Sequence, residues 1–571
     1  IILVLIFPLF SEAQDVLGQE TTFNIESSYD FSQRGQLSAT LIKISFSAYW
    51  YIDTNFWQGL SPEERAETEQ SLNFLIQEFE ELIYPKLTGT FGSEWSPGID
   101  KDTRITILMH PMRKESGGYF DSSDEYPKVQ LPESNEREMI YLNTQYINTN
   151  YAKSFLAHEF IHLITFNQKN KIYNITEDTW LNEARAEYAS AFLGYDKEYQ
   201  GSNLERRVKD FLDKPSDSLS EWRDAPADYG IVNLFTQYLV DHYGVNILTD
   251  SLKMRQTGIA SLNAVLSQQG FKEDFSQIFT NWTIAVLVND CQVSEKYCYF
   301  NQNLKNFRIT PLVNYLPFIG ESTLSVTNAT KDWAGNWHKF IGGKGTLTVE
   351  FTKNGGANFK VPYVIQDLDG NFTVDDLLFT ENQSGEIIIS DFGSKNIALI
   401  IIPIAQNKIA GFANLEPSRT FFWSASTKEE KEQEEINIII PPLSKPISQM
   451  TRAEILARIT QLQNLVGQLQ NLLVNLSGVS ASCKSITENL FFGILNNPQV
   501  SCLQEFLKSQ GIDIYPEGIV SGNFGKLTQM AVVRFQEKYA AEILAPLGFG
   551  QGTGFVGVST RAKINQLLTL R

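Results

Sequence analysis

The spacing of apolar residues changes several times along this chain, and one packed core cannot accommodate those changes. Strand-like and helical stretches alternate from about 35 to 110, with a capping box of Ser61 and Glu64 at the start of one helix, and helical spacing dominates from 151 to about 290. The runs at 104–109 and 139–142 predict strands with a Gly- and Asp-rich loop between them, and a free edge of the second strand could pair with an extended peptide. Strand patterns broken by Gly-Gly and Asp-Gly turns then fill 306–426. Because single cores stop growing at about 250–300 residues, 571 residues indicate several domains. We therefore predict a multidomain protein with an α+β domain whose second half is helical, followed by a β-sandwich.

A charged and Pro-rich segment separates the C-terminal part of the chain. Residues 427–450 contain KEEKEQEE and PPLSKP, which are typical of a linker. Residues 451–478 repeat apolar side chains at alternating intervals of four and three, which predicts a short coiled-coil-like helix. That helix either pairs weakly with a second copy through 455–476 or serves as a spacer. Three amphipathic segments in 483–571 predict a small three-helix domain.

The N-terminal residues indicate export. The apolar run in 1–13 is followed by Ser11 and Ala13, as at the end of a signal peptide, and it is too short for a membrane span of about 20 residues. Residues 14–40 are expected to form an N-terminal extension, and the sequence leaves open whether it is a propeptide. We expect an extracellular protein.

The cysteines and the charge agree with a protein that works outside the cell. The four cysteines fall into two local pairs, and we predict the disulfides Cys291–Cys298 and Cys483–Cys502. The formal net charge is −19 at pH 7. Because an anionic surface repels a phosphate backbone, we expect no nucleic-acid partner.

The segment AKSFLAHEFIHLITFN contains the candidate metal-binding and catalytic residues. On a helix, His158 and His162 share one face, so both imidazoles can bind one metal ion. Glu159 would then face the open coordination position as a general base for a metal-bound water. The alternative is a pair of satisfied core histidines. Since HExxH on a helix is typical of zinc hydrolases, we predict a zinc site.

The helical segment TEDTWLNEARAEYASAFLG offers a third ligand. Glu183 and Glu187 lie on one face, far enough after His162 for a second helix to return antiparallel. We predict Glu183 as the ligand, with Glu187 and Asn182 supporting the ligating imidazoles, although the roles of the two glutamates could be exchanged. Gln168 stands where a metzincin would have its third histidine, which excludes that class.

The motifs HEFIH and WLNEARAE together resemble the gluzincin pattern of thermolysin-like metallopeptidases, and more closely the hyicolysin-type enzymes. The resemblance covers roughly 40–290. It implies a zincin-like peptidase domain over 41–305, with His158, His162 and Glu183 as zinc ligands and Glu159 as the base.

Enzymes of this kind also place a hydrogen-bond donor against the oxyanion of the reacting carbonyl. Tyr229, in PADYGIVNLF, is the first candidate, and His242 and Tyr243 are the next. His110 and His338 have no partner pattern and are expected to be structural.

Residues 483–571 resemble the small peptidoglycan-binding domain of bacterial cell-wall enzymes. The resemblance is carried by CLQEFLKSQGI, GNFGKLTQMAVVRFQEKY and GFVGVSTRAKINQLL. It implies that the protein is associated with the cell wall through peptidoglycan.

The sequence is compatible with three functions. The first is a secreted zinc endopeptidase that hydrolyses amide bonds of a protein or peptide substrate and is anchored to the cell wall. The second is a peptidase that cuts peptidoglycan cross-links, and the third is a catalytically inactive, wall-associated binding protein. The intact HExxH motif and its acidic partner favour an enzyme, and the gluzincin pattern favours protein substrates.

Overall fold

The computed structural model describes residues 15–317, 322–353, 356–380, 383–428, 450–451, 454–455, 458, 485–495 and 497–569. It divides into two compact units, Ile1–Gln433 and Glu434–Arg571. The predicted signal segment, Cys483, and most of the predicted linker and of the 451–478 helix lie outside the described residues. The predicted dimer contact through 455–476 falls there too.

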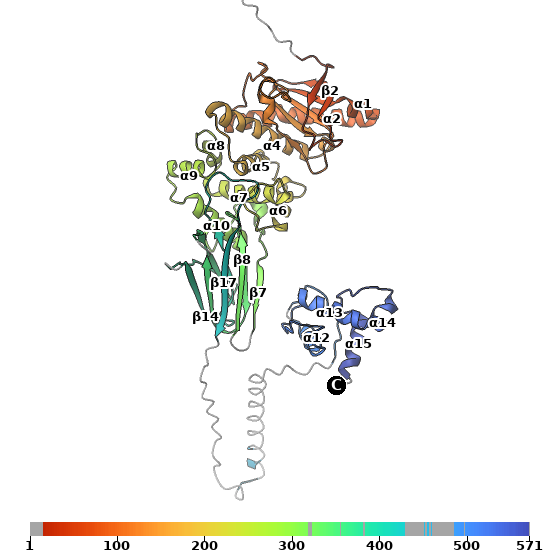
Figure 1. Cartoon of the computed structure of the whole chain (residues 1–571), viewed down its shortest axis with the longest axis vertical. Helices are drawn as coiled ribbons and strands as arrows, with labels where there is room; N and C mark the ends of the chain where they lie inside the picture. Colours follow the sequence, from red (N-terminus) through yellow and green to blue (C-terminus); the bar gives the residue numbers. More distant parts are fainter. Residues whose placement is uncertain are drawn as a thin grey trace, which may run out of the picture. The chain divides into compact units, whose positions relative to one another are not determined.

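A mixed sheet of order β1-β2-β3-β4-β6-β5 forms the N-terminal part of the first unit (Figure 1). Its strands are β1 (Glu20–Asn24), β2 (Gln36–Ile44), β3 (Ala48–Asp53), β4 (Ile105–His110), β5 (Gly118–Tyr119) and β6 (Met139–Asn143). The strands predicted at 104–109 and 139–142 are confirmed as β4 and β6. The expected boundary at residue 40 falls inside β2, which pairs with β3, so the N-terminal segment belongs to this sheet.

Three helices lie between β3 and β4 in the chain, and the others follow β6 and form the second half of the domain, as the spacing of apolar residues predicts. They are α1 (Thr54–Gly59), α2 (Pro62–Glu78), α3 (Tyr84–Phe91), α4 (Tyr151–Thr165), α5 (Thr179–Leu193), α6 (Asn203–Asp213), α7 (Pro226–Tyr243), α8 (Asn246–Leu252), α9 (Gly258–Gln268) and α10 (Phe275–Val288). Short helical turns are η1 (Phe79–Ile83), η2 (Ser122–Glu125), η3 (Thr144–Tyr146), η4 (Phe166–Lys171), η5 (Glu295–Tyr297) and η6 (Gln302–Leu304). Ser61 caps α2 in a capping box with Glu64, as its sequence predicts.

Two local features set the position of α4 and α5. Nearly every residue of α4 is buried, because the helix runs between the sheet and the other helices. The α5 helix ends at Gly194, whose φ of +87° is the left-handed conformation that glycine adopts without strain. The two helices pack against each other, so side chains on their facing surfaces can meet.

A β-domain follows the helices in the same unit. Its strands are β7 (Leu312–Leu316), β8 (Ser322–Thr330), β9 (His338–Gly342), β10 (Gly345–Lys353), β11 (Phe359–Lys360), β12 (Pro362–Asp367), β13 (Phe372–Asp376), β14 (Ser384–Phe392), β15 (Asn396–Ile401), β16 (Ile404–Ala405) and β17 (Arg419–Lys428). The strands β14 and β15 share one residue pair, Phe392 with Asn396, so the sheet folds into two halves. Alternate residues of β10 and β14 are buried in a common core.

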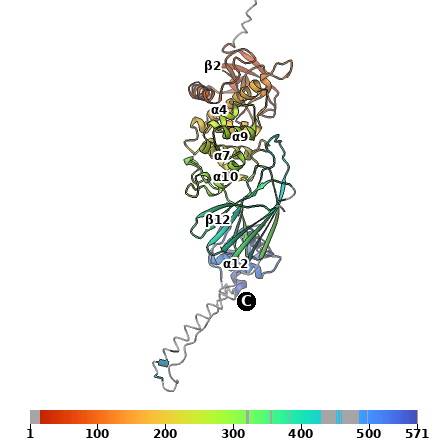
Figure 2. The same ribbon diagram turned by 90° about the vertical axis from the view of Figure 1, so that its left-hand side faces the viewer.

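The β-domain lies against α10 in both ribbon views (Figures 1 and 2). The Trp337 indole donates a hydrogen bond to the Thr283 carbonyl of α10, at 2.9 Å. Trp333 and Trp337 join the core of the helical half, so the two regions share buried surface.

The second unit contains α12 (Pro498–Ser509), α13 (Lys526–Lys538), α14 (Ala540–Ile543), η8 (Ala545–Leu547) and α15 (Val558–Thr569) around one apolar core. Gln504 and Gln536 occupy equivalent places in it, because each side chain binds the turn that precedes the next helix. The Gln504 amide contacts Ser521, Gly522, Asn523 and Thr528, and the Gln536 amide contacts Thr553, Gly554, Phe555 and Thr560. Both glutamines are therefore structural residues of a repeated helix-turn element.

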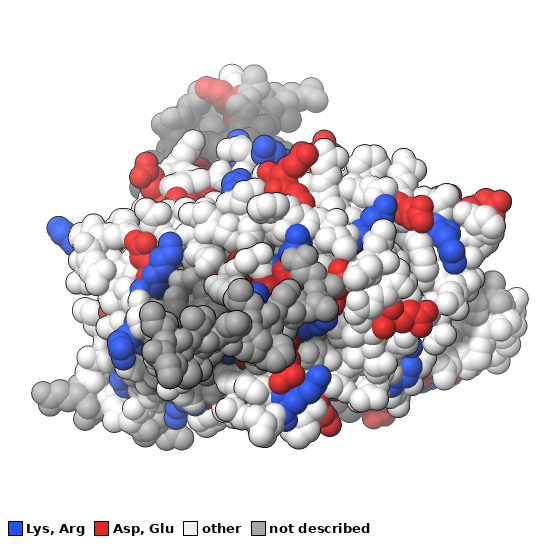
Figure 3. Space-filling model, turned by 90° about the horizontal axis from the view of Figure 1, so that it is seen from above, with Lys and Arg blue, Asp and Glu red and all other residues white. Residues whose placement is uncertain are grey.

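Two surface properties complete the description. No helix among the described residues is long and apolar enough to cross a bilayer. On the face seen in Figure 3, acidic and basic side chains are interspersed with uncharged ones. Such a mixed surface favours solubility.

Candidate metal centre

The α4 and α5 helices bring the predicted site residues together at one cavity. The His158 and His162 ring centroids are 4.8 Å apart. Their ring nitrogens and the Glu159 carboxylate provide one possible ligand atom each, all within 4.8 Å of one another. The cavity has a volume of about 490 Å³, and Glu183, Glu187 and Tyr229 also line it.

Glu183 faces both imidazoles across a gap that suits a cation. Its Oε2 lies 3.3 Å from His158 Nε2, and its Oε1 lies 3.6 Å from His162 Nε2. Two ligands bound about 2.0–2.1 Å from a tetrahedral zinc ion are about 3.4 Å apart. Glu183 Oε2 is also buried without a hydrogen-bond partner. These separations and the unpaired oxygen fit a zinc ion held by the three side chains.

Each imidazole is oriented by a partner at its other nitrogen. His162 Nδ1 lies 3.1 Å from Asn182 Oδ1, and the amide oxygen accepts a hydrogen bond from this nitrogen. His158 Nδ1 lies 3.4 Å from Glu187 Oε1. Both contacts leave Nε2 free to ligate, which is the usual arrangement around metal-binding histidines.

Glu187 already has a full set of donors. Arg207 donates to both of its oxygens, at 2.6 and 2.9 Å, and Asn203 and Asn233 donate to Oε2. Burial alone would raise the pKa of Glu187, but Arg207 and His158 outweigh it and hold this pKa well below its usual range. Of the two glutamates, Glu183 therefore presents the open oxygen, and Glu187 holds His158 in place.

The charges of the site favour a bound cation. Burial alone would lower the pKa of His158, but the carboxylates of Glu183 and Glu187 raise it to about 10. Burial raises the pKa of Glu159 to about 8, and the neighbouring Glu183 and Glu187 contribute to that rise. Glu187 is neutralised by Arg207, so the carboxylates of Glu159 and Glu183 are the ones that face the two imidazoles. A divalent ion would offset their charge once both imidazoles bind it in the neutral form.

The strand β5 forms the edge of the sheet next to Glu159. From the sequence we expected a Gly-rich loop at these residues. The prediction of a free edge on the strand at 139–142 was wrong, because β5 pairs with β6 on that side. A Cβ atom at Gly118 would lie 2.9 Å from Glu159 Cγ and 2.5 Å from the Tyr141 carbonyl oxygen. Only glycine lets this strand approach Glu159 so closely.

Tyr229 lies in the cavity, as expected of a donor to the reacting carbonyl. Its ring centroid is 6.4 Å from that of His158, and the Arg207 guanidinium lies over the ring at 4.4 Å. Its hydroxyl donates to Asp224 at 2.6 Å. Burial and the charges of Glu183 and Asp224 raise the pKa of Tyr229 well above its usual value, so the phenol keeps its proton.

The structure does not bring His242 to the site. His242 lies at the opposite end of α7 from Tyr229, about 20 Å away at the helical rise of about 1.5 Å per residue. Its Nε2 lies 3.0 Å from the Cys298 carbonyl, and its ring packs between Tyr238 and Phe300. Tyr243 packs against Phe271 instead of the cavity. Both were wrong candidates, because helix membership does not tell which end reaches the site.

Several cavity residues have no motif in the sequence. Arg207 binds Glu187, 20 positions earlier in the chain, and Asp224 binds Tyr229, and no motif predicts either pair. Tyr29 comes from the segment that was expected to be an extension, and it stacks on Tyr119 with centroids 4.7 Å apart.

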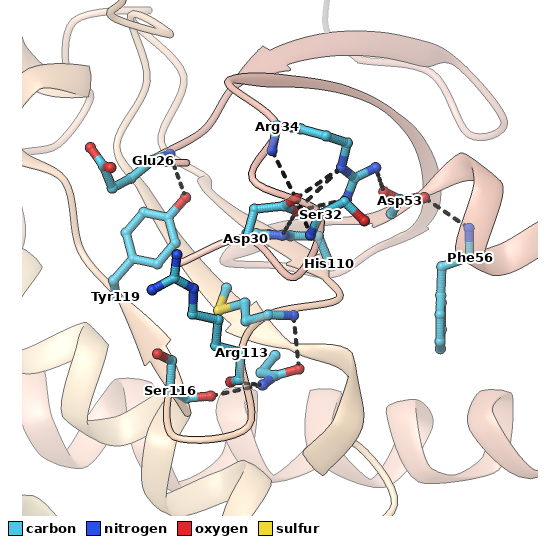
Figure 4. A network of polar contacts seen from close by, with 12 residues as sticks. Glu26, Asp30, Ser32, Arg34, Asp53, Phe56, His110, Arg113, Ser116 and Tyr119 are labelled. Carbon is cyan, nitrogen blue, oxygen red and sulfur yellow. Dashed lines mark hydrogen bonds and ion pairs between the residues drawn. The ribbon is translucent and has the colours of Figure 1, made fainter. Parts of the chain in front are cut away.

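A polar network fixes the turn that carries Tyr29 (Figure 4). Asp30 accepts hydrogen bonds from the Arg34 guanidinium, and Arg34 also binds Asp53 at 2.6 Å. His110 Nδ1 lies 3.2 Å from Asp30. The structural role expected of His110 is confirmed, and His338 is likewise buried, against Phe421 and Trp423.

The predicted Cys291–Cys298 disulfide is confirmed. The predicted Cys483–Cys502 bridge includes a residue outside the described part of the chain.

Among known proteins, a metalloprotease is similar to part of this chain. No protein-family model matches the chain. It is 26% identical over 261 residues to the neutral metalloprotease ShpI of Staphylococcus hyicus, a match that covers 41% of this chain and 56% of that protein. The chain therefore spans little more than half the length of this relative. The similarity is weak, and the relative is described as a metalloprotease.

Comparison with solved structures adds no argument. The pre-peptidase C-terminal domain of a Bacillus anthracis collagenase is 10% identical, with a TM-score of 0.14, over 20% of this chain and 96% of that domain. The lysozyme inhibitor PliG of Aeromonas hydrophila is 7% identical, with a TM-score of 0.15, over 20% of this chain and 98% of that protein.

Proposed function

We propose that this protein is a secreted zinc-dependent endopeptidase that hydrolyses amide bonds of proteins or peptides. The observation that carries the proposal is the convergence of His158, His162 and Glu183, whose carboxylate turns one oxygen to each imidazole nitrogen and has no hydrogen-bond partner at Oε2. His158 Nε2, His162 Nε2 and a Glu183 oxygen would hold the ion. Zinc at this point would act as a Lewis acid that polarises the scissile carbonyl and makes water more acidic.

Glu159 has the position of a general base. It follows His158 directly on α4, and its carboxylate lies between the edge strand β5 and the proposed ligands. In our proposal the carboxylate accepts a proton from the attacking water and returns it to the leaving amine.

Tyr229 has the position of a donor to the carbonyl oxygen. The cation–π contact with Arg207 and the hydrogen bond to Asp224 fix its ring. Since the phenol stays protonated, its hydroxyl can stabilise the negative charge that develops during attack.

The edge strand favours an extended peptide as substrate. The β5 strand forms the edge of the sheet beside Glu159, and an extended chain can add to such an edge through main-chain hydrogen bonds. A peptidoglycan cross-link peptidase is the second candidate, favoured by the likeness of residues 483–571 to wall-binding domains. Anchoring to the cell wall through those residues is part of the proposal. The complete ligand set speaks against a catalytically inactive binding protein.

The test compares full-length wild type with Glu159→Gln on casein and on purified peptidoglycan. We expect wild type to digest casein and Glu159→Gln to be slower by about 10²- to 10⁴-fold. Glu69→Gln, an exposed change on α2, is the matched control and should leave the rate unchanged. Digestion of peptidoglycan alone would replace the first candidate with the second. An unaffected rate in Glu159→Gln would contradict both.

A further inference from the structure

Two adjacent arginines of α6 line the cavity and differ in how they are paired. Arg207 binds Glu187 and also Asp210, whose Oδ2 lies 3.1 Å from Nη1. Arg206 donates to Asn203 Oδ1 at 2.7 Å, but its Nε is buried without a hydrogen-bond partner. Within the part of the chain that the structure describes, no carboxylate lies within 4.0 Å of the Arg206 guanidinium. Arg206 is therefore a cation without a counter-ion in the cavity.

Aromatic rings hold this guanidinium beside the proposed metal centre. It lies over Phe155 at 5.1 Å and over Tyr151 at 6.0 Å. Phe155 precedes His158 by one turn of α4, and it also lines the cavity. On its other side the backbone of Gly117, next to β5, contacts the Phe155 ring so closely that a Cβ there would lie 2.5 Å from it. The Arg206 subsite, defined as Phe155, Arg206 and Gly117, thus adjoins both the metal centre and the edge strand.

The charge of Arg206 is costly where it lies. Burial and the neighbouring charge of Arg207 lower the pKa of Arg206 to about 10, so the side chain remains a cation at neutral pH. The nearby carboxylates of Glu187 and Asp210 are already bound by Arg207. A carboxylate brought by a ligand would supply the missing partner, and the planar guanidinium suits it well.

We propose that Arg206 binds a carboxylate of the substrate, so that the enzyme prefers an acidic group at the Arg206 subsite. The inference deepens the proposed function and rests on it. Two sources carry this chemistry, an Asp or Glu side chain within the peptide and the carboxylate at a peptide's C-terminus. The first would make an endopeptidase selective for acidic residues, and the second would favour cleavage near chain ends.

The kinetic test uses peptides that differ in one group. Peptides with Glu or the neutral isostere Gln, placed at each position flanking the scissile bond and amidated at the C-terminus, test the side chain. The same peptides ending in a free carboxylate at that position test the terminus. We expect the kcat/KM of wild type to be about tenfold to a hundredfold higher for peptides with one of the two carboxylates than for their neutral counterparts. This is the effect typical of a hydrogen bond to a charged group.

Variants of the same helix identify the residue responsible. Arg206→Met should reduce the preference to within about twofold, and Arg206→Lys should keep part of it, because it keeps the charge and loses the planar fork. Lys209→Met removes a positive charge from an exposed position of α6 and should leave the preference unchanged. A preference that persists in Arg206→Met would overturn the proposal, as would the absence of any preference in wild type.

A binding measurement separates this proposal from the proposed function. Fluorescein-labelled Glu and Gln peptides are titrated with Glu159→Gln protein and with the Glu159→Gln, Arg206→Met double variant, and anisotropy is recorded. Tighter binding of the Glu peptide that is lost in the double variant would support the subsite even if no peptide were hydrolysed. Equal binding of both peptides, together with hydrolysis by wild type, would refute the subsite and leave the peptidase intact.

Discussion

Two clusters of buried charge lie on opposite sides of α5, and they differ in how completely their atoms are paired. On one side Arg185 donates to Glu177, the Leu248 carbonyl and Ser251. Lys169 donates to three backbone carbonyls, and Glu177 accepts from the amides of Asp178 and Gly258. Every charged group of this closed cluster has partners within the protein.

The other side of α5 carries the metal-site cluster, which remains open. Glu187 is fully paired through Arg207, but Glu183 Oε2 and Arg206 Nε are buried without a hydrogen-bond partner. His158 faces Glu183 and Glu187 at 3.3 and 3.4 Å. Buried charges that satisfy one another stabilise a fold, whereas buried charges with open atoms mark a place where a ligand completes the set. The two clusters therefore predict opposite effects of mutation.

The largest effect is expected for Glu183→Gln. The change removes the carboxylate that faces both imidazoles, so hydrolysis of casein should fall by at least about 10³-fold because the metal is no longer held. For the metal-free proteins the free energy of unfolding should change little, since among the described residues Glu183 pairs only with the two histidines. A variant that keeps wild-type activity would show that another group is the ligand.

Arg185→Met should have the next largest effect, and on stability instead of activity. Glu177 would lose a buried partner and keep only Lys169, and breaking a buried ion pair typically costs about 3–5 kcal/mol. Denaturant titration monitored by circular dichroism measures the loss, and the activity of the folded protein should be retained. A loss of less than about 1 kcal/mol, the size seen for exposed ion pairs, would contradict the view that the closed cluster stabilises the fold.

Tyr229→Phe tests the open cluster without touching a ligand. The variant loses the hydroxyl near the reacting carbonyl, so kcat should fall by about 10²- to 10³-fold while KM and metal content stay close to wild type. A change confined to KM would assign Tyr229 to substrate binding alone.

Glu187→Gln should give the smallest effect. The amide keeps the shape of the side chain but loses the charge that orients His158 and pairs with Arg207. Metal affinity measured against a competing chelator should fall by about 10- to 100-fold. A complete loss of metal, equal to that of Glu183→Gln, would exchange the roles of the two glutamates.

The sequence was informative where the relevant contacts are local. The spacing of His158, Glu159 and His162 fixes their common face on any helix, and the distance to Glu183 leaves room for an antiparallel partner. The capping box at Ser61 and the Cys291–Cys298 disulfide depend on near neighbours in the same way.

Features that depend on distant contacts were missed. The two-residue strand β5 has too few residues for a strand pattern, and its glycines indicate a loop. Arg207 and Tyr29 reach the cavity only through tertiary packing, and His242 was misplaced because periodicity gives the face of a helix but not its end. The pairing of the buried charges, on which the two clusters differ, can be known only from the packed structure.

The zinc content of the purified full-length chain tests the central claim most directly. We expect about one zinc ion per chain in wild type and in Glu159→Gln, and loss of most of it in His162→Ala and Glu183→Gln, because three ligands hold the ion. Arg185→Met should retain its zinc. Equal zinc in wild type, His162→Ala and Glu183→Gln would contradict the account.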